Sequence, residues 1–531
     1  MNPEQIGKTL NVKTDIPFSD KTEDPSVIDT SGRISIIFSE ELDMNTIPDG
    51  IKLYKVKPDG TQQDVDVKIN IDEKSPSVLY INKSGAISEG EKYKLSVNCK
   101  LKSVNGKSLN GEFVNFFAVD YSFNLESEGI PDLNNERNLI LCISDLHLGA
   151  NDSYAELTKN REALVNFLEQ VKNSPNVKEL VIAGDLIDEW FIPMHLDTFN
   201  GKTQRDFTKA VASNNKSVMD AFNNIIKDGK VKLTYVPGNH DLLINSEDIQ
   251  SILPGISEAR DVRGLGAYTP PDFPEVIIEH GHRYNFYCAP DYSNRALTQT
   301  DTILPPGYFF TRMATSSVMQ GRPKLDFTFP PVNKNELGEV QFFYYLYWNV
   351  WKGLITDFPV NQGMDEKVIN TQIDGFTDCY AINDVLPYQN SEDDYIDVNL
   401  YNGIVETWDE RQDKNLVNVK IPTDEAVLKG AFASHLDDQS HVQFFKNPDS
   451  DKKIVIFGHS HEARVITSFN EKQEKQVYVN SGTWIDLNKC TMTFVAIILP
   501  KDEDSSLTFV NLYQYSPSGD IKKLKSEALQ I

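Results

Sequence analysis

Five short polar blocks of aspartate, asparagine and histidine contain six of the nine histidines in the sequence. The blocks are Asp145-Leu146-His147, Asp185 with Asp188, Asn239-His240-Asp241, His280 with His282, and His459 with His461. Carboxylate, amide and imidazole ligands together suit hard or borderline divalent ions such as Mn, Zn or Fe, and no thiolate is needed. One carboxylate can bridge two ions through its two oxygens. Two ions about 3.5–4 Å apart can clamp a phosphoryl group and generate hydroxide near neutral pH.

Each block follows a short apolar run that we expect to form a buried strand. The runs are LILCIS (139–144), ELVIAG (179–184), KLTYVPG (232–238), EVIIE (275–279) and KKIVIFG (452–458). Segments 156–174 and 217–229 have helical apolar spacing, and strands alternating with helices indicate an α/β layered core. Ligands of open α/β sheets bind beyond the carboxyl ends of the strands. The blocks are therefore expected to converge, although they span more than 300 residues.

Each block has an ordinary structural interpretation when it is taken alone. Asp145 or Asp185 could cap a helix, and Asn239 could be a turn residue. A single buried histidine is often only hydrogen-bonded. Five such blocks at five strand ends favour a common site instead. The other three histidines, His195, His435 and His441, fit no block and are expected to be ordinary surface or cap residues.

The pattern D-x-H, G-D-x-x-D, G-N-H-D, H-G-H and G-H-S-H resembles the calcineurin-like metallophosphoesterase superfamily across about residues 145–483. The resemblance implies a four-layer αββα sandwich and two divalent metal ions, Mn, Fe or Zn. It implies that the first metal is held by Asp145, His147 and His461, the second by Asn239, His280 and His459, and that Asp185 bridges them. The first histidine of the H-G-H block is the usual ligand, so His282 is expected to lie behind His280.

The resemblance also implies a role for His240 that is not metal binding. His240 would donate a proton or a charged hydrogen bond to the leaving-group oxygen. Asp188 would orient it, and Asp241 is expected to be a structural loop residue. The reaction implied is hydrolysis of a phosphomonoester, phosphodiester or pyrophosphate. The alternatives are a protein Ser/Thr phosphatase and a non-catalytic metal-binding scaffold or surface interaction module.

The substrate is less well indicated than the chemistry. Glu189 stands where protein Ser/Thr phosphatases of this superfamily have an arginine, which disfavours that reading. SDLHLG (144–149) and GDLIDEW (184–190) resemble UDP-diacylglucosamine pyrophosphohydrolases locally, but the H-G-H block and a long aromatic insertion depart from them. We therefore expect a small phosphorylated substrate, with nucleotide-linked and lipid-linked compounds both open. Arg283 is a candidate phosphate clamp, or else a surface salt-bridge residue.

Composition limits the partners of this chain. The 531 residues carry a formal net charge of −26, which argues against nucleic acid as a partner. No apolar run approaches the roughly 20 residues of a transmembrane segment. The five cysteines are scattered and suggest no disulfide framework. The chain begins without the apolar core of a signal peptide, so its localisation stays open between the cytoplasm and export.

The chain is expected to divide into several parts. Residues 1–27 would be a flexible arm, 28–121 an all-β sandwich, 122–137 a linker, and 138–531 the metallophosphoesterase domain with an insertion at about 288–445. The stretch ISIIFSEELDMNTI (34–47) resembles the opening of bacterial Ig-like domains of the surface-layer type, which hints at the cell envelope. Within the insertion, 339–355 is apolar nearly all round and is expected to be a buried packing helix, or else a lipid-facing or substrate-facing one. Segments 491–499 and 506–515 are expected to form a closing β-hairpin.

Overall fold

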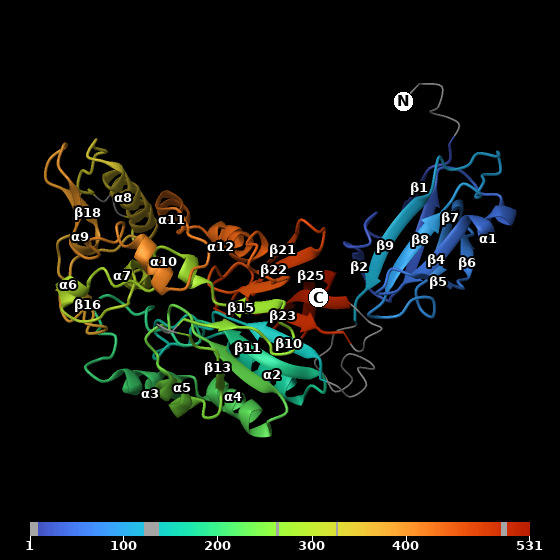
Figure 1. Ribbon diagram of the computed structural model, residues 1–531. Helices are drawn as coiled ribbons and strands as arrows, with labels where there is room; N and C mark the ends of the chain where they lie inside the picture. Colours follow the sequence, from blue (N-terminus) through green and yellow to red (C-terminus); the bar gives the residue numbers. More distant parts are fainter. Residues whose placement is uncertain (1–8, 122–136, 262–264, 325–327, 501–506) are drawn as a thin grey trace.

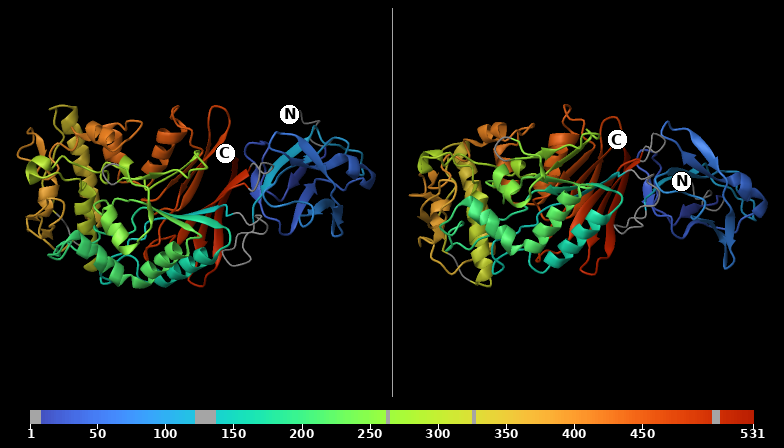
Figure 2. Two further views of the ribbon diagram at one scale, coloured as in Figure 1. Left: turned by 60° about the horizontal axis from the view of Figure 1, so that its bottom comes forward. Right: turned by 90° about the horizontal axis from the view of Figure 1, so that it is seen from below.

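The computed structural model of this protein describes residues 9–121, 137–261, 265–324, 328–500 and 507–531. It shows a mixed α/β protein with several sheets, which confirms the expected α/β class. The N-terminal strands lie beside the C-terminal strands at one end of the molecule (Figure 1), and two further views give the same arrangement (Figure 2).

The N-terminal region contains two sheets that share one hydrophobic core. One sheet has the order β1 (Val12–Thr14), β3 (Arg33–Phe38), β7 (Ser75–Asn82), β6 (Ile69–Asp72). The other has the order β2 (Ser26–Ile28), β9 (Phe113–Val119), β8 (Lys92–Val97), β4 (Ile51–Val56), β5 (Gln62–Val65), and α1 (Ile47–Gly50) leads into β4. Alternating side chains such as Ile34, Ile36, Leu53 and Leu95 fill the core from both sheets, as the strand period of two requires.

One expectation for this region was wrong. Residues 1–27 are not a flexible arm as far as they are described: β1 pairs with β3, β2 pairs with β9, and Leu10 and Ile16 are buried. The chain crosses from one sheet to the other between β5 and β6, which belong to different sheets. Of the expected linker 122–137, residues 122–136 lie outside the described part of the chain.

A seven-stranded sheet carries the first three polar blocks. Its order is β13 (Ser257–Glu258), β12 (Lys232–Val236), β11 (Val177–Ala183), β10 (Leu139–Ile143), β23 (Thr493–Ile498), β24 (Leu507–Tyr515), β25 (Ile521–Gln530). Strands β10 to β13 are parallel to one another, whereas β23 is antiparallel to β10. The expected hairpin of β23 and β24 is confirmed, and β25 extends it beyond what the sequence had suggested.

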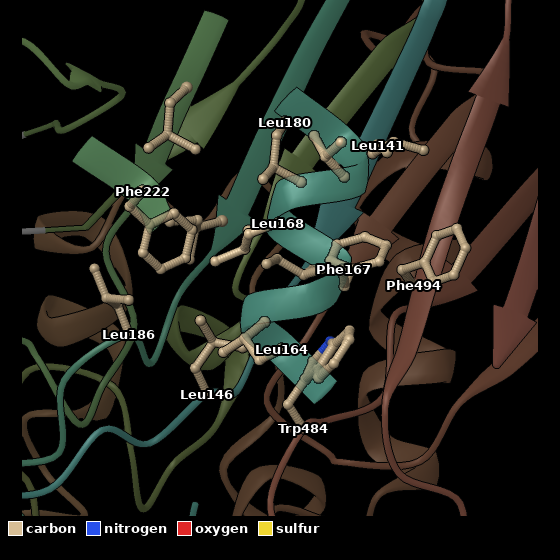
Figure 3. Packing of buried hydrophobic residues seen from close by; sticks show 14 of the residues in the cluster. Leu141, Leu146, Leu164, Phe167, Leu168, Leu180, Leu186, Phe222, Trp484 and Phe494 are labelled. Carbon is tan, nitrogen blue, oxygen red and sulfur yellow. The ribbon is translucent and has the colours of Figure 1, made fainter. Parts of the chain in front are cut away.

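Helices cover the outer face of this sheet. They are α2 (Arg161–Asn173), α3 (Gln204–Asn214), α4 (Lys216–Asp228) and α5 (Ser246–Ile252). Figure 3 shows the contact for α2, whose Leu164, Phe167 and Leu168 face Leu141 of β10 and Leu180 of β11. The apolar residues of α2 recur every three or four positions, so one stripe of the helix meets the sheet.

A five-stranded sheet packs against the inner face of the seven-stranded one. Its order is β14 (Ala267–Tyr268), β15 (Val276–Glu279), β20 (Ile454–Phe457), β22 (Lys475–Asn480), β21 (Arg464–Phe469). Ile140 and Val181 of the first sheet meet Ile278 and Ile456 of the second in one buried cluster. The parallel strands β15, β20 and β22 deliver the last two polar blocks at the same edge.

The inserted segment, residues 288–445, packs on the outer face of the five-stranded sheet. It contains α6 (Arg295–Thr298), α7 (Pro306–Met319), α8 (Glu339–Asp357), α9 (Ile382–Val385), α10 (Trp408–Lys414), α11 (Thr423–Lys429) and α12 (Ser434–Ser440). Two short ladders join β16 (Ile369–Asn370) to β17 (Cys379–Tyr380) and β18 (Pro387–Gln389) to β19 (Ile396–Val398). Leu436 and Phe444 pack with Val455 and Phe457 of β20, so helices, two sheets and helices are stacked in turn.

Helix α8 is not buried all round, contrary to the expectation for 339–355. Tyr347 and Trp351 are buried on one face, whereas Phe342 and Phe343 are half-buried and Val340 is exposed. None of the described helices is both long enough and apolar enough to cross a membrane.

Two buried arginines fasten the inserted segment to the rest of the protein. Arg312 of α7 donates to the backbone carbonyls of Ile192 (2.7 Å) and Pro193 (3.1 Å) in the loop after β11. Arg411 of α10 donates to the carbonyl of Phe286 (3.0 Å), which precedes the segment, and pairs with the buried Asp291 (2.9 Å). Because carbonyls left without these donors would be unsatisfied and buried, the arginines hold the segment in one position.

Candidate metal centre

The structure brings the side chains of the five polar blocks together at the carboxyl ends of the strands. Three groups of potential ligands have their donor atoms within 4.8 Å of one another. Two of them contain Asp185, namely Asp145, His147, Asp185 and His461, and Asp185, His280 and His459; the third is His147, Asp188 and His240. Asn239, which follows β12, reaches the second group, because its Oδ1 lies 3.0 Å from His280 Nε2.

Five of these side chains project from residues whose backbone is in the left-handed region. They are Asp145 (φ 54°), His147 (φ 47°), Asp185 (φ 53°), His459 (φ 68°) and His461 (φ 57°). Such conformations are uncommon outside glycine and cost on the order of 1–3 kcal/mol each. Backbone hydrogen bonds hold them in place, including His147 N to the Asp185 carbonyl at 2.9 Å. Strain concentrated at neighbouring loops is typical of functional sites.

Glycine precedes three of the blocks because the chain passes very close to the ligand groups. A Cβ at Gly238 would overlap the Asp185 carboxylate, and one at Gly458 would lie 2.6 Å from Asp145 Oδ2. The G-N and G-H pairs of the sequence therefore have a steric cause in this structure.

The hydrogen bonds of His147 and His280 assign the proton to one ring nitrogen in each. His147 Nδ1 lies 3.0 Å from Asp188 Oδ2, and His280 Nδ1 lies 2.8 Å from the Ala183 carbonyl, so both Nδ1 atoms donate. The Nε2 atoms therefore face the shared centre, and in the neutral rings they carry the lone pair that a metal would bind. His147 Nε2 lies 3.0 Å from His461 Nε2, and His280 Nε2 lies 3.1 Å from Asp185 Oδ2. This orientation by a second hydrogen bond is what metal-binding histidines require.

The electrostatics of the centre also suit cations. Burial disfavours the charged form of His280, but Asp185 and Asp145 outweigh it and raise its pKa to about 9. Burial, together with the nearby His280, lowers the pKa of His459 to about 3, so its imidazole is neutral. The carboxylates of Asp185 and Asp145 stabilise positive charge, and a neutral imidazole lies beside them. This set of donor groups suits divalent metal ions.

His240 lies beside the two ligand groups that share Asp185 but outside both of them. Its Nδ1 donates to Asp188 Oδ1 at 2.8 Å, and its ring stacks on Trp190 with centroids 4.7 Å apart. Asp188 also accepts the backbone N–H of Trp190 (2.8 Å) and Phe191 (2.7 Å), which fixes its position. Burial opposes protonation of His240, but Asp188 and Asp185 raise its pKa.

Three further residues lie near the centre, and of these Glu156 and Trp190 were given no role by sequence reasoning. Glu156 Oε2 lies 3.5 Å from His147 Nδ1, Trp190 supports the His240 ring, and Asn285 Nδ2 lies 3.1 Å from His459 Nε2. Trp190 and Asn285 directly follow recognised blocks, so proximity in sequence was a usable signal. Glu156 lies nine residues after His147 in a loop, and no spacing rule indicates it.

Other candidates have structural positions. Asp241 accepts the backbone N–H of Leu186 (2.9 Å) and joins two strand-end loops. His282 is buried outside the three ligand groups, and its ring nitrogens have no hydrogen-bond partner among the described residues. Arg283 is neither a phosphate clamp nor a surface salt bridge. It is 4% exposed and pairs with Glu279 and Asp261, away from the cavity.

The remaining histidines lie outside the centre. His195 is exposed, and His441 is half-buried. His435 is a buried residue of the inserted segment, with Nε2 3.0 Å from the Tyr284 carbonyl.

A cavity of about 440 Å³ opens over the centre. Asp185, Asn239, His240, His459 and His461 line its floor, and residues of α7, α8 and the α11–α12 turn line the opposite wall. The candidate ligands are therefore reachable by a small molecule.

Comparisons with known proteins bear on this region. Residues 139–314 match the family model described as calcineurin-like phosphoesterase. A search of curated proteins returns no match.

Solved structures that resemble the chain include bacterial surface-layer and copper-resistance proteins. The N-terminal part of the bacterial S-layer protein SbsC is 18% identical over 22% of this chain, with a TM-score of 0.16, and the match spans 25% of the SbsC chain. PcoC from Escherichia coli is 17% identical over 18% of this chain and 89% of its own, with a TM-score of 0.16. CopC from Methylosinus trichosporium OB3b is 16% identical over 19% of this chain and 90% of its own, with a TM-score of 0.15. Scores this low carry no argument about function.

The family match and the buried His/Asp cluster fall in the same part of the chain and agree with each other. Together they support the calcineurin-like phosphoesterase superfamily for this region, and they indicate a phosphoesterase hydrolase.

Proposed function

We propose that this chain is a binuclear metal-dependent hydrolase that cleaves a phosphomonoester, a phosphodiester or a pyrophosphate. The observation that carries the proposal is the pair of ligand groups that share Asp185 at the floor of an open cavity. A shared carboxylate between two sets of imidazoles is the arrangement that a two-metal site needs.

The proposed ligands of the first metal are Asp145, His147 and His461, those of the second are Asn239, His280 and His459, and Asp185 bridges both. Mn, Fe or Zn at these positions would supply Lewis-acid polarisation of a phosphoryl group and deprotonation of water near neutral pH. The Asp145 carboxylate is fixed in position for metal binding, because it accepts the backbone N–H of His459 at 3.1 Å.

His240 is proposed to donate to the leaving-group oxygen. It lines the cavity, its Nδ1 is engaged by Asp188, and its other ring nitrogen has no partner among the hydrogen bonds of the described residues. A histidine whose pKa is raised by a carboxylate holds its proton until the ester bond breaks. Trp190 restricts the ring to one plane by stacking, so the proton is held in a defined direction.

The N-terminal region is proposed to be an Ig-like β-sandwich that supports the hydrolase rather than completing its site. Two sheets around one core support this reading, and none of the described residues that line the cavity belongs to it. We keep the proposed hydrolase domain at residues 138–531, with the insertion at about 288–445, and extend the proposed sandwich toward the N-terminus from residue 28 so that it includes β1 and β2.

The test is hydrolysis of bis-p-nitrophenyl phosphate beside p-nitrophenyl phosphate, with added Mn and with a chelated control. Chelator-sensitive turnover is expected, and the preferred compound separates diester from monoester activity. Metal analysis of the same samples accompanies the assay. Full occupancy by metal without turnover of either compound would favour the non-catalytic scaffold instead.

A further inference from the structure

The cavity over the metal centre has two walls of opposite character. Its floor is polar and consists of strand-end loops, whereas the wall from the inserted segment is apolar. The apolar side chains of that wall that reach the cavity surface are Phe310, Leu354 and Phe432, whereas Trp351 and Trp190 (from the loop after β11) lie behind them with 0% and 1% of their surface exposed. Phe432 is 65% exposed at the surface, so the apolar lining continues to solvent.

The apolar wall begins next to the proposed proton donor. Trp190 stacks on His240, and α7 crosses directly over Trp190, because a Cβ at Gly307 would lie 3.2 Å from its ring. Phe310, one turn further along α7, lies with its ring 6.3 Å from that of Trp351. Because Trp190 is only 1% exposed, Phe310 is the aromatic side chain that the group attached to the leaving-group oxygen can contact.

The wall offers little to a charged or strongly polar group. Among the described residues that line the cavity there is no lysine or arginine, and Glu462 adds a further negative charge. The Thr311 hydroxyl is already used, because it donates to the Gly307 carbonyl at 2.9 Å. The Tyr287 hydroxyl likewise donates to the Val427 carbonyl at 2.9 Å. A sugar, a base or a second phosphate that lay against Phe310, Leu354 and Phe432 would lose its water hydrogen bonds to those side chains without replacement.

We infer that the substrate is a phosphoester of an apolar alcohol, whose uncharged alkyl or aryl group lies along Phe310, Leu354 and Phe432 while the phosphoryl group lies at the metal centre. This inference rests on the proposed function and names the substrate class of that site. It excludes nucleotides and anionic leaving groups as preferred substrates.

The experiment uses a series of n-alkyl phosphoesters, from ethyl through butyl to hexyl, with the full-length metal-loaded protein. Alkyl alcohols of this series differ little as leaving groups, so differences report on binding along the wall. Each methylene that enters the apolar wall is expected to raise kcat/KM by about three- to fourfold. Turnover is followed by ³¹P NMR, which detects monoester and diester cleavage alike.

The outcomes separate the inference from the proposed function. Hydrolysis that rises with chain length supports both. Equal or falling rates from ethyl to hexyl would overturn the inference and leave the hydrolase intact. Absence of hydrolysis for every ester, with metal bound, would overturn the proposed function itself.

A variant places a cation on the wall. Leu354→Lys keeps a good helix former in α8. It is expected to flatten the dependence on chain length and to favour the phosphoester of 6-hydroxyhexanoate, whose carboxylate would pair with the new lysine. Leu428→Lys is the matched control, because Leu428 is 43% exposed on α11 and does not line the cavity. An unchanged chain-length dependence in Leu354→Lys would contradict the proposed path of the alkyl group.

A second variant tests the same inference if Leu354→Lys fails to fold. Phe310→Ala removes half-buried aromatic carbon from the same wall without adding charge. It is expected to raise KM for the hexyl ester by about tenfold and to leave the ethyl ester within about twofold. An equal change for both esters would point to a general loss of structure and count against the inference.

Discussion

The two walls of the cavity are built in opposite ways. The floor takes its polar side chains from five loops, five of the seven candidate ligands have a left-handed backbone, and hydrogen bonds orient ligands such as His147 and His280. The opposite wall takes apolar side chains from a few helices and is held by packing and by two buried arginines. The difference indicates that the chemistry and the choice of substrate are separate properties of this protein, and substitutions should change one without the other.

The largest effect is expected from the residue shared by the two proposed metal-ligand groups. Asp185→Asn removes one negative charge between two cations, so metal content should fall and turnover should drop by at least about 10³-fold. Metal analysis and the p-nitrophenyl ester assays measure both. His195→Ala is the control, because His195 is exposed outside the centre. Wild-type metal content in Asp185→Asn would refute the ligand assignment.

Removal of the proposed proton donor should slow the reaction and leave the metal content unchanged. His240→Ala is expected to reduce turnover of alkyl esters by about 10²–10⁴-fold, and to affect p-nitrophenyl esters least, because their leaving group needs no proton. The ratio of the two rates is the measurement. A uniform loss on both substrates would argue that His240 positions the centre rather than donating a proton.

A smaller change at the floor tests the steric role of its glycines. Gly238→Ala places a Cβ against the Asp185 carboxylate and is expected to weaken metal binding by about 10–100-fold. Isothermal titration with Mn provides the affinity. Gly353→Ala is the matched control, since a Cβ there meets nothing within 4 Å in α8 and should be tolerated. Equal affinities in the two variants would show that the loop can move aside.

Substitutions that disturb the inserted segment should change substrate binding rather than the rate of the chemical step. Arg312→Met leaves the carbonyls of Ile192 and Pro193 without their donor and is expected to cost about 3 kcal/mol of stability. KM should rise by about tenfold, whereas metal content should stay unchanged. Thermal unfolding and steady-state kinetics measure the two effects. Loss of metal in Arg312→Met would mean that the inserted segment also supports the floor.

The smallest effect on activity is expected far from both walls. Asp120 is buried and bonds Asn511, Lys523 and Ser526, so it ties the N-terminal sheets to β24 and β25. Asp120→Ala should lower stability by about 1–3 kcal/mol and leave kcat within about twofold. Calorimetry and the ester assays provide the values. A strong loss of activity would show that the N-terminal region acts on the centre.

The floor could be predicted from the sequence much better than the wall. Short spacings such as those of Asp145 with His147 mark pairs of side chains that a single strand end delivers together. The apolar runs before them were equally clear, because buried parallel strands are nearly continuous in hydrophobic residues. Glu156 reaches the floor from a loop with no recognisable pattern, and it could not be found this way.

The composition of the inserted segment could be recognised in the sequence, but its three-dimensional arrangement could not. The aromatic run of α8 indicated burial, yet only the face with Tyr347 and Trp351 is buried, because the segment forms a single layer over the sheet. Arg283 was misplaced for a related reason. Glu279 is only four residues away, but the burial of Arg283 and its second partner Asp261 come from tertiary packing, which the neighbouring sequence does not reveal.

The central position of β10 has a consequence for synthesis of the protein. β10 pairs on one side with β11, which follows soon after it, but on the other side with β23, which is made about 350 residues later. At a translation rate of about 5–20 residues per second, the edge of β10 that pairs with β23 stays unpaired for roughly 20–70 s. An unpaired apolar strand edge is prone to aggregation. Ribosome-bound chains shorter than about residue 498 should therefore depend on chaperones far more than the finished protein does.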